Sequence, residues 1–99
     1  MAGTTLPALA ADAPTSQEWR VCTGDGSSSD LVIKSCSVVI QAGRETKARL
    51  AIAHYHRATA YRMEGRTDRA IQDYDQAIEL DPKYAIAFND RGTAYSQKA

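Results

Sequence analysis

Apolar residues recur at helical spacing between residues 67 and 80. They fall at i, i+1, i+4, i+7 and i+8, the pattern of a helix with one buried face: Ala70, Ile71, Tyr74, Ala77 and Ile78. Thr67 can cap this helix at its start, with Asp68 in its first turn. Asp81-Pro82 can end it and begin the next helix.

A run of small and apolar residues precedes this segment, at Ala51, Ala53, Ala58 and Tyr61. Gly65 follows the run and tolerates the positive φ angle at which many helices end. The alanines let two helix backbones approach closely. The two segments therefore predict an antiparallel helix pair, and a third helix follows it.

Residues 30–42 carry the same spacing of apolar residues as residues 70–78, position for position: Val32, Ile33, Cys36, Val39 and Ile40. β-branched residues are frequent here, so a strand is the competing interpretation, but the spacing favours a helix. Ser29 or Asp30 can cap this helix, and Gly43 can end it.

A short helix from about Ser16 to Cys22, carrying Trp19, would precede it. Gly24 to Ser29 has the composition of a turn between the two. The expected fold is all-α, an antiparallel helix-turn-helix array (an α-solenoid) of about five helices. Its divisions are a tail or signal remnant, an eroded helix pair, a full repeat and the first helix of a truncated repeat: 1–15, 16–43, 47–82 and 83–99.

The chain also repeats itself. The stretch Ala51–Tyr61 returns as Ala85–Tyr95, at an offset of 34 residues and with seven identical positions. A fixed period of this size is typical of stacked helical repeats, which bury their cores between neighbouring repeats and present extended binding surfaces.

The repeat resembles the tetratricopeptide (TPR) family. The residues that carry the resemblance lie at the family's marker positions: Tyr61, Gly65, Ala70, Tyr74, Ala77, Leu80 and Pro82, then Phe88, Gly92 and Tyr95. Two residues of the first copy depart from the pattern. His54 stands where a large apolar residue is usual, and Ala58 stands where glycine is usual.

In this family the first helix of each repeat lines a concave groove that binds peptides. The resemblance implies groove positions on the two repeated helices: Ile52, Tyr55, Thr59 and Arg62, then Ile86, Asn89, Thr93 and Ser96. Ile52 and Ile86 can equally pack between helices. Tyr55 would offer an apolar face and a polar tip, and Arg62 could bind a carboxylate. His56 and Asp90 occupy places where some relatives carry asparagine, and Asp90 would repel an anion.

The last helix has no following helix to cover it. Ile86, Ala87, Ala94 and Tyr95 should therefore present apolar surface. Ile86 and Tyr95 are the candidates for self-association into a homo-oligomer. Alternatively, this surface meets a partner, or the natural protein continues beyond Ala99.

Cys22 and Cys36 are the only cysteines, and the expected helices place them close to one shared turn. A disulfide between them is expected, the alternative being two reduced, buried thiols in a cytosolic protein. Residues 6–13 are similar to the small-residue end of a bacterial secretory signal, although an alanine-rich tail is equally compatible. Together with the resemblance, these features favour a periplasmic or secreted protein over a cytoplasmic one.

The charge balance and the candidate chemical groups limit the classes of function that are expected. Acidic and basic residues balance at 12 each, and no apolar run is long enough for a membrane span, so neither nucleic acid nor membrane is an expected partner. The basic cluster Arg44, Lys47 and Arg49 is interpreted as solvated. His54 and His56 lie about 200° apart on a helix and cannot share a metal, so His54 is expected in the core and His56 on the surface.

No arrangement of residues predicts catalysis or a cofactor. An acidic run is interpreted as a solvated helix face: Asp68, Asp73, Asp75, Glu79 and Asp81. The expected function is protein–protein interaction, a non-catalytic scaffold or adaptor that binds a peptide or helix. The alternative is a self-assembling structural module, and a third reading, an enzyme or metal carrier, lacks any supporting motif.

Overall fold

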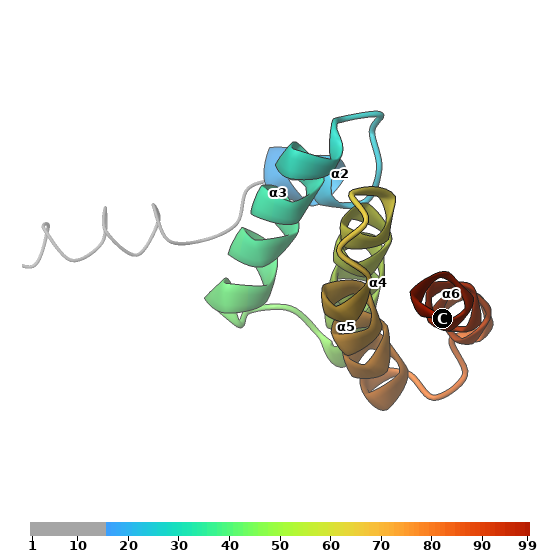
Figure 1. The fold of residues 1–99 in the computed structure, drawn as a ribbon. Coiled ribbons are helices and arrows are strands. Elements are labelled where there is room, and N and C mark those ends of the chain that lie inside the picture. The colour runs from blue at the N-terminus through green and yellow to red at the C-terminus, as the bar shows by residue number, and fades with distance from the viewer. Residues whose placement is uncertain (1–15) are drawn as a thin grey trace, which may run out of the picture.

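The computed structural model describes residues 16–99, so the expected tail and signal remnant lie outside the described residues. The described residues form five α-helices and no strand: α2 (Ser16–Cys22), α3 (Ser29–Ala42), α4 (Lys47–Met63), α5 (Thr67–Leu80) and α6 (Ala85–Lys98). The all-α fold class with about five helices is confirmed. Each helix packs against the next one along the chain (Figure 1).

The helices begin and end where local hydrogen bonding allows it. Ser28 caps α3 by accepting from the Leu31 amide at 3.4 Å, and Thr46 caps α4 by accepting from the Arg49 amide at 3.2 Å. Gly43 ends α3 in the left-handed region, at φ 65°. Gly43 ends α3 as predicted, but the predicted N-caps Ser29 and Asp30 were wrong by one and two residues, because Ser28 has the extended backbone that a capping position requires.

The predicted cap of α5 was also wrong. Thr67 is already the first residue of the helix, and the residue before it, Arg66, makes no side-chain capping bond. Gly65, at φ 78°, turns the chain between α4 and α5. Asp68 does lie in the first turn of α5, where its charge complements the helix dipole.

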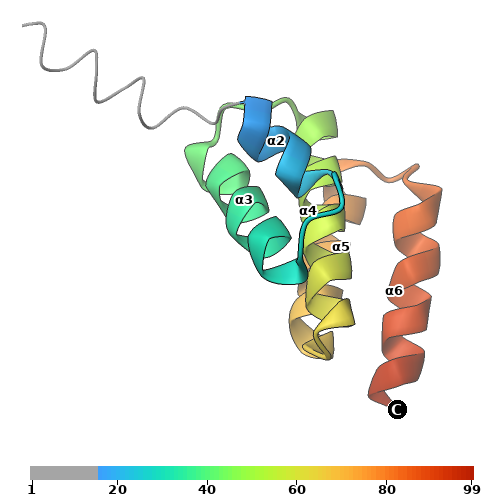
Figure 2. The same ribbon diagram turned by 90° about the horizontal axis from the view of Figure 1, so that it is seen from above.

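Helix α4 lies at the centre of the molecule and contributes to two buried clusters (Figure 2). Ala53 and Ala60 face α2 and α3, whose buried members are Cys22, Val32, Cys36 and Val39. Ala58 and Tyr61 face the other way, toward Ala70, Ile71 and Tyr74 of α5 and Ala94 of α6. Alanines on both sides let neighbouring helices approach α4 closely.

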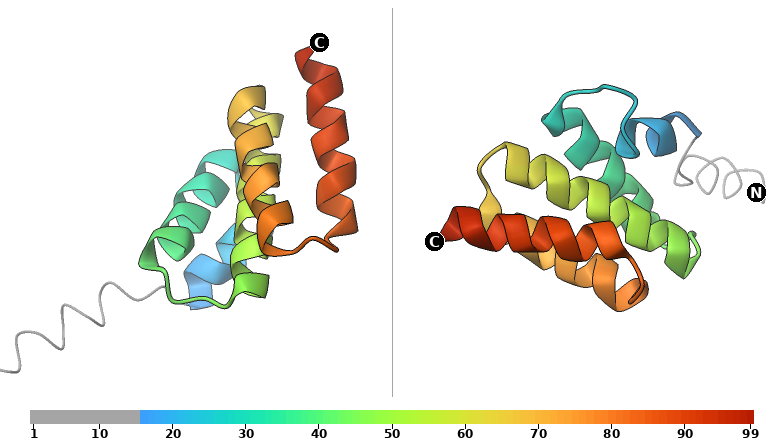
Figure 3. Two further views of the ribbon diagram at one scale, coloured as in Figure 1. Left: turned by 90° about the horizontal axis from the view of Figure 1, so that it is seen from below. Right: turned by 90° about the vertical axis from the view of Figure 1, so that its right-hand side faces the viewer.

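Helix α6 packs along α5 and reaches α4 over a smaller contact (Figure 3). Ala87 and Ala94 are fully buried in this contact. The expectation that these two alanines would be exposed was therefore wrong, because α5 and α4 already cover them. Ile86 and Tyr95 are half-exposed, as expected.

Candidate functional site

The acidic run on α5 contains one buried carboxylate. Asp73 is 4% exposed, accepts from Arg57 Nε at 2.7 Å and Nη2 at 2.8 Å, and lies 2.9 Å from His54 Nδ1. Burial alone would raise the pKa of Asp73, but the hydrogen bonds from His54 and Arg57 outweigh it and lower the pKa below its ordinary value. Asp73 is thus a carboxylate that accepts hydrogen bonds from both partners, and Nδ1 of His54 is the donor in its pair with Asp73.

The interpretation of Asp73 as part of a solvated face was wrong. Asp73 follows Ala70 by three residues and precedes Ala77 by four, a spacing that already places it on the buried side of the helix. His54 is in the core, as expected, and Asp73 supplies the hydrogen bond that it needs there. Arg57 also donates through Nη1 to Ser37 of α3 at 3.0 Å, so this group joins three helices.

The predicted groove residues of α4 are held by contacts within the chain. The Tyr55 hydroxyl donates to Asp90 Oδ2 of α6 at 2.6 Å, so its polar tip is already occupied. Burial and the bond to Asp90 raise the pKa of Tyr55. Thr59 Oγ1 lies 2.9 Å from the Tyr74 hydroxyl, and Arg62 Nε donates to that same hydroxyl at 3.3 Å.

Aromatic rings join the two predicted groove helices. The Tyr55 ring lies 5.2 Å from the ring of Tyr84, which precedes α6, and 5.8 Å from that of Tyr74. Asp90 accepts the Tyr55 hydroxyl proton instead of standing as a lone anion. Tyr55 and Asp90 therefore attach α6 to α4, and Thr59 and Arg62 are partly buried polar groups beside them.

The predicted groove residues of α6 are exposed. Asn89, Thr93 and Ser96 lie on the outer surface of the helix. Asn89 Nδ2 donates to Asp90 Oδ1 at 3.3 Å, and Thr93 Oγ1 donates to the Asn89 carbonyl at 3.4 Å. These contacts are local to α6, so they leave this surface accessible.

A pocket of about 290 Å³ lies on the other side of Thr59. Helix α4 lines it with His56, Thr59, Ala60 and Met63; the other lining residues come from the α2–α3 turn and the helix ends beside it: Cys22, Gly24, Gly26, Ser27, Ser29 and Val32. Sequence reasoning missed this pocket, because nothing in a Gly-Ser turn shows which helix it will lie against.

His56 was expected on the surface, and this expectation was wrong. The side chain is partly buried beside the α2–α3 turn, and burial lowers its pKa. The three residues of the basic cluster, Arg44, Lys47 and Arg49, are all exposed, as expected. The Arg49 guanidinium also stacks over the Trp19 ring at 3.8 Å and pairs with Glu45 at 2.6 Å.

The predicted self-association residues do not share one surface. Ile86 and Tyr95 are 50% and 51% exposed, but nine residues of helix turn them about 180° apart. A single flat contact cannot cover both side chains. Self-association itself stays a prediction.

The remaining sequence expectations concern the cysteines and metal binding. Cys22 and Cys36 form a disulfide that joins the end of α2 to the middle of α3. Between residues 16 and 99 there is no group of three or more His, Cys, Asp or Glu side chains arranged to hold a metal ion. None of the helices in that range combines the length and apolar content of a membrane span.

Comparison with known proteins identifies the repeat. Residues 58–98 match the family model described as TPR repeat, and the match spans the end of α4, all of α5 and α6. No curated protein and no solved structure matched the chain. The helix pair of α4 and α5, the 34-residue internal repeat and this match agree, and the chain therefore contains a tetratricopeptide repeat.

Proposed function

We propose that this chain is a non-catalytic interaction module that binds a segment of another protein on α4, between the α2–α3 turn and α6. TPR repeats point to protein partners, and the observation that carries the location is the pocket beside Thr59. Pockets with mainly apolar walls and a few polar groups at the rim are the usual sites for anchoring side chains.

The residues at the rim of the pocket indicate which kind of ligand would fit. Cys22, Val32, Ala60 and Met63 supply apolar surface for one large apolar side chain. Thr59 lies between this pocket and Arg62, whose Nε is engaged with Tyr74 while its outer nitrogens can donate. Asp90 lies near enough to Arg62 to raise its pKa, after the larger effect of Tyr74. A backbone or amide oxygen therefore suits Arg62 better than a free carboxylate.

A peptide-display selection on the immobilised chain tests this proposal. Selected peptides should share a large apolar residue next to hydrogen-bond acceptors, and Met63→Glu should weaken their binding at least about ten-fold by placing a charge at the pocket rim. Met63 is 74% exposed, so the change leaves the core intact. Leu31→Glu, at an apolar position 51% exposed and outside the pocket, is the matched control. Equal weakening by both variants would contradict the proposed location.

We further propose that the protein works in an oxidising compartment, either periplasmic or secreted. The Cys22–Cys36 disulfide supports this, since such bonds persist mainly outside the cytosol. Protein taken from its native cells into acid and alkylated at once should carry no alkyl group on either cysteine. Alkylation of both cysteines without added reductant would instead place the protein in a reducing compartment.

The Cys22–Cys36 disulfide should also stabilise the folded chain. It closes a loop between residues 14 apart, and a loop of this length contributes about 3 kcal/mol to the free energy of unfolding. Urea denaturation with and without reductant measures the difference, and the double variant Cys22→Ala/Cys36→Ala should not respond to reductant.

A further inference from the structure

The pocket beside Thr59 contains one unused polar group. Of the described residues that line it, only His56 has a side chain that changes its charge near neutral pH. Its imidazole is half-buried, and within residues 16–99 its ring nitrogens make no hydrogen bond or ion pair. Neither nitrogen is sealed from solvent. The ring can therefore form a hydrogen bond with a ligand that enters the pocket.

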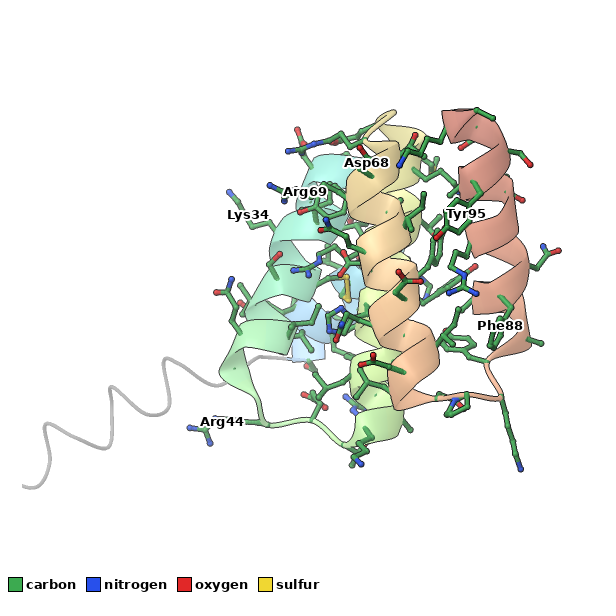
Figure 4. All side chains as sticks on the ribbon, turned by 60° about the horizontal axis from the view of Figure 1, so that its bottom comes forward. Lys34, Arg44, Asp68, Arg69, Phe88 and Tyr95 are labelled. Carbon is green, nitrogen blue, oxygen red and sulfur yellow. A yellow bond between two sulfur atoms is a disulfide. The ribbon has the colours of Figure 1, made fainter. Side chains whose placement is uncertain are left out.

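The α2–α3 turn and Tyr55 hold the His56 ring in place. The Tyr55 ring meets it edge to face, with 5.1 Å between the ring centroids. A Cβ atom added at Gly24 would lie 4.0 Å from His56 Cε1, so the turn backbone passes close to the ring. The Cys22–Cys36 disulfide, the yellow bond in Figure 4, ties the start of this turn to α3. A ring held in the pocket wall lowers the entropic cost of binding.

The groups around His56 leave its imidazole neutral near neutral pH. Burial lowers the pKa of His56, and no carboxylate lies close enough to oppose this effect. In the α2–α3 turn, Asp25 Oδ1 accepts from the Ser27 amide at 3.1 Å and from its hydroxyl at 2.5 Å. On α4, the neighbouring Arg57 is paired with Asp73. Among residues 16–99, a protonated His56 would therefore have no counter-charge.

The rim of the pocket is acidic. Three carboxylates adjoin its lining residues along the chain: Asp25 in the turn, Asp30 at the start of α3 and Glu64 at the end of α4. A hydrogen bond between the Asp30 and Glu64 side chains raises the pKa of Glu64. Arg66 pairs with Glu64 at 3.5 Å, whereas Asp25 and Asp30 have no ion pair within residues 16–99. Such a rim opposes an anionic ligand and favours one that donates hydrogen bonds.

We propose that His56 selects the side chain that enters the pocket, because its neutral imidazole accepts a hydrogen bond from the indole N–H of a tryptophan on the partner protein. This inference rests on the proposed function and specifies its ligand. Val32, Ala60 and Met63 supply apolar walls for the ring in a pocket of about 290 Å³. Indole donates and does not accept, which suits an acceptor beside carboxylates. An aliphatic side chain would displace water from the imidazole without replacing its hydrogen bond.

Acid should release this ligand. Both nitrogens of a protonated imidazole are donors, so the acceptor is lost. Binding should weaken as the pH falls through the folded-state pKa of His56, which lies below its ordinary value of 6.5. Because the ligand binds the neutral form, saturation with ligand should lower the pKa of His56 further.

N-acetyltryptophanamide is the probe, and its matched control is the analogue in which sulfur replaces the indole N–H. Both are titrated to about 5 mM into the isotope-labelled 99-residue chain, where weak complexes are still seen. At about pH 7.5 the indole should shift the amides of residues 24–29 and 56–63 and bind at least about five-fold more tightly than the analogue. This advantage should vanish near pH 5, and the His56 Cε1–H resonance reports the pKa with and without probe.

Protein variants complete the test. His56→Gln keeps an amide acceptor that does not titrate, so it should prefer the indole at both pH values. His56→Leu should bind the two probes equally. Equal binding of both probes to the unaltered chain, tighter indole binding in acid, or no shifts at the pocket would each overturn the inference. Acid weakening that persists in His56→Gln would do the same, since it would come from the rim carboxylates.

The inference and the proposed function can fail separately. Peptides selected by display could lack tryptophan and still be weakened by Met63→Glu. That result would overturn the role of His56 and leave the pocket on α4 as the binding site.

Discussion

At the scale of single residues, Asp73 contributes most to holding the helices together. Its two oxygens accept from Arg57 and His54, and Arg57 extends the contact to Ser37. Three helices therefore depend on one carboxylate that is nearly inaccessible to water. A buried charge of this kind is tolerated only while every partner is in place.

Replacing this carboxylate should cost stability. We expect Asp73→Asn to lower the free energy of unfolding by about 2 to 4 kcal/mol, because Arg57 loses its counter-charge while it remains mostly buried. Urea denaturation measures the change. Glu79→Gln removes an exposed carboxylate from the same helix and should stay within about 0.5 kcal/mol of the unaltered chain. A small effect at position 73 would mean that water replaces the carboxylate.

The same residue should give stability a dependence on acid pH. The pKa of Asp73 is lower in the folded chain than the value near 3.9 expected when unfolded. Its contribution is therefore complete above about pH 5 and is lost as the pH falls through the folded-state pKa. The stability difference between the unaltered chain and Asp73→Asn should shrink between about pH 5 and pH 2. A difference that stays constant over this range would contradict a charged Asp73.

At the scale of elements, Gly65 and Gly92 differ in their role, because one lies at a helix end and the other lies inside a helix. Gly65 has φ 78° and turns the chain after α4, whereas Gly92 lies inside α6 with open space around it. Ala58, the counterpart of Gly92 in the first copy, is a fully buried helix residue. The same repeat position thus accepts either residue, and only the glycine at a turn is required by its backbone angle.

Opposite effects should follow from the same substitution at these two glycines. Gly92→Ala should raise the free energy of unfolding by about 0.5 to 1 kcal/mol, since alanine favours the helix interior. Gly65→Ala should lower it by about 1 kcal/mol, because the left-handed backbone is strained for alanine. Thermal unfolding of both variants checks the pair. Destabilisation by Gly92→Ala would show that the space beside Gly92 is filled in the free protein.

At the scale of the whole molecule, α4 is shared by both buried clusters and α6 lies at one edge. Helix α6 is attached to α4 through Tyr55 and Asp90, and to α5 through the pairs Arg91–Asp75 and Lys98–Asp68. The Lys98 pair is well exposed and contributes little. Of these polar contacts, the Tyr55–Asp90 bond is the one that joins α6 to α4, the helix that lines the pocket.

Loosening this contact should free α6 before the rest of the fold. Tyr55→Phe removes the 2.6 Å bond to Asp90 and should speed amide hydrogen exchange in α6 about five-fold, the equivalent of about 1 kcal/mol, with little change in α3. Tyr84→Phe removes a hydroxyl from the same group of rings without such a bond and is the control. Uniformly faster exchange across all helices would show that α6 unfolds only with the whole chain.

The sequence by itself determined the helices and the repeat. Apolar spacing at 32–40 and 70–78 is a local property, and so is the preference of Gly43 and Gly65 for helix ends. The disulfide was also foreseeable, because both cysteines lie close to one turn. Capping positions were less well determined, since Ser28, Ser29 and Asp30 can all cap a helix and backbone geometry chooses among them.

Only the tertiary structure decided which polar groups meet. The spacing of Asp73 could have placed it on a buried face, but its pairing with Arg57 and His54 depends on how α5 lies against α4. The occupation of the Tyr55 hydroxyl by Asp90, the burial of His56 and the pocket beside Thr59 likewise join segments far apart in the chain. Helical periodicity is a pattern over a few neighbouring residues, so a single sequence shows it directly. These contacts arise from packing between helices, which the sequence shows far less directly.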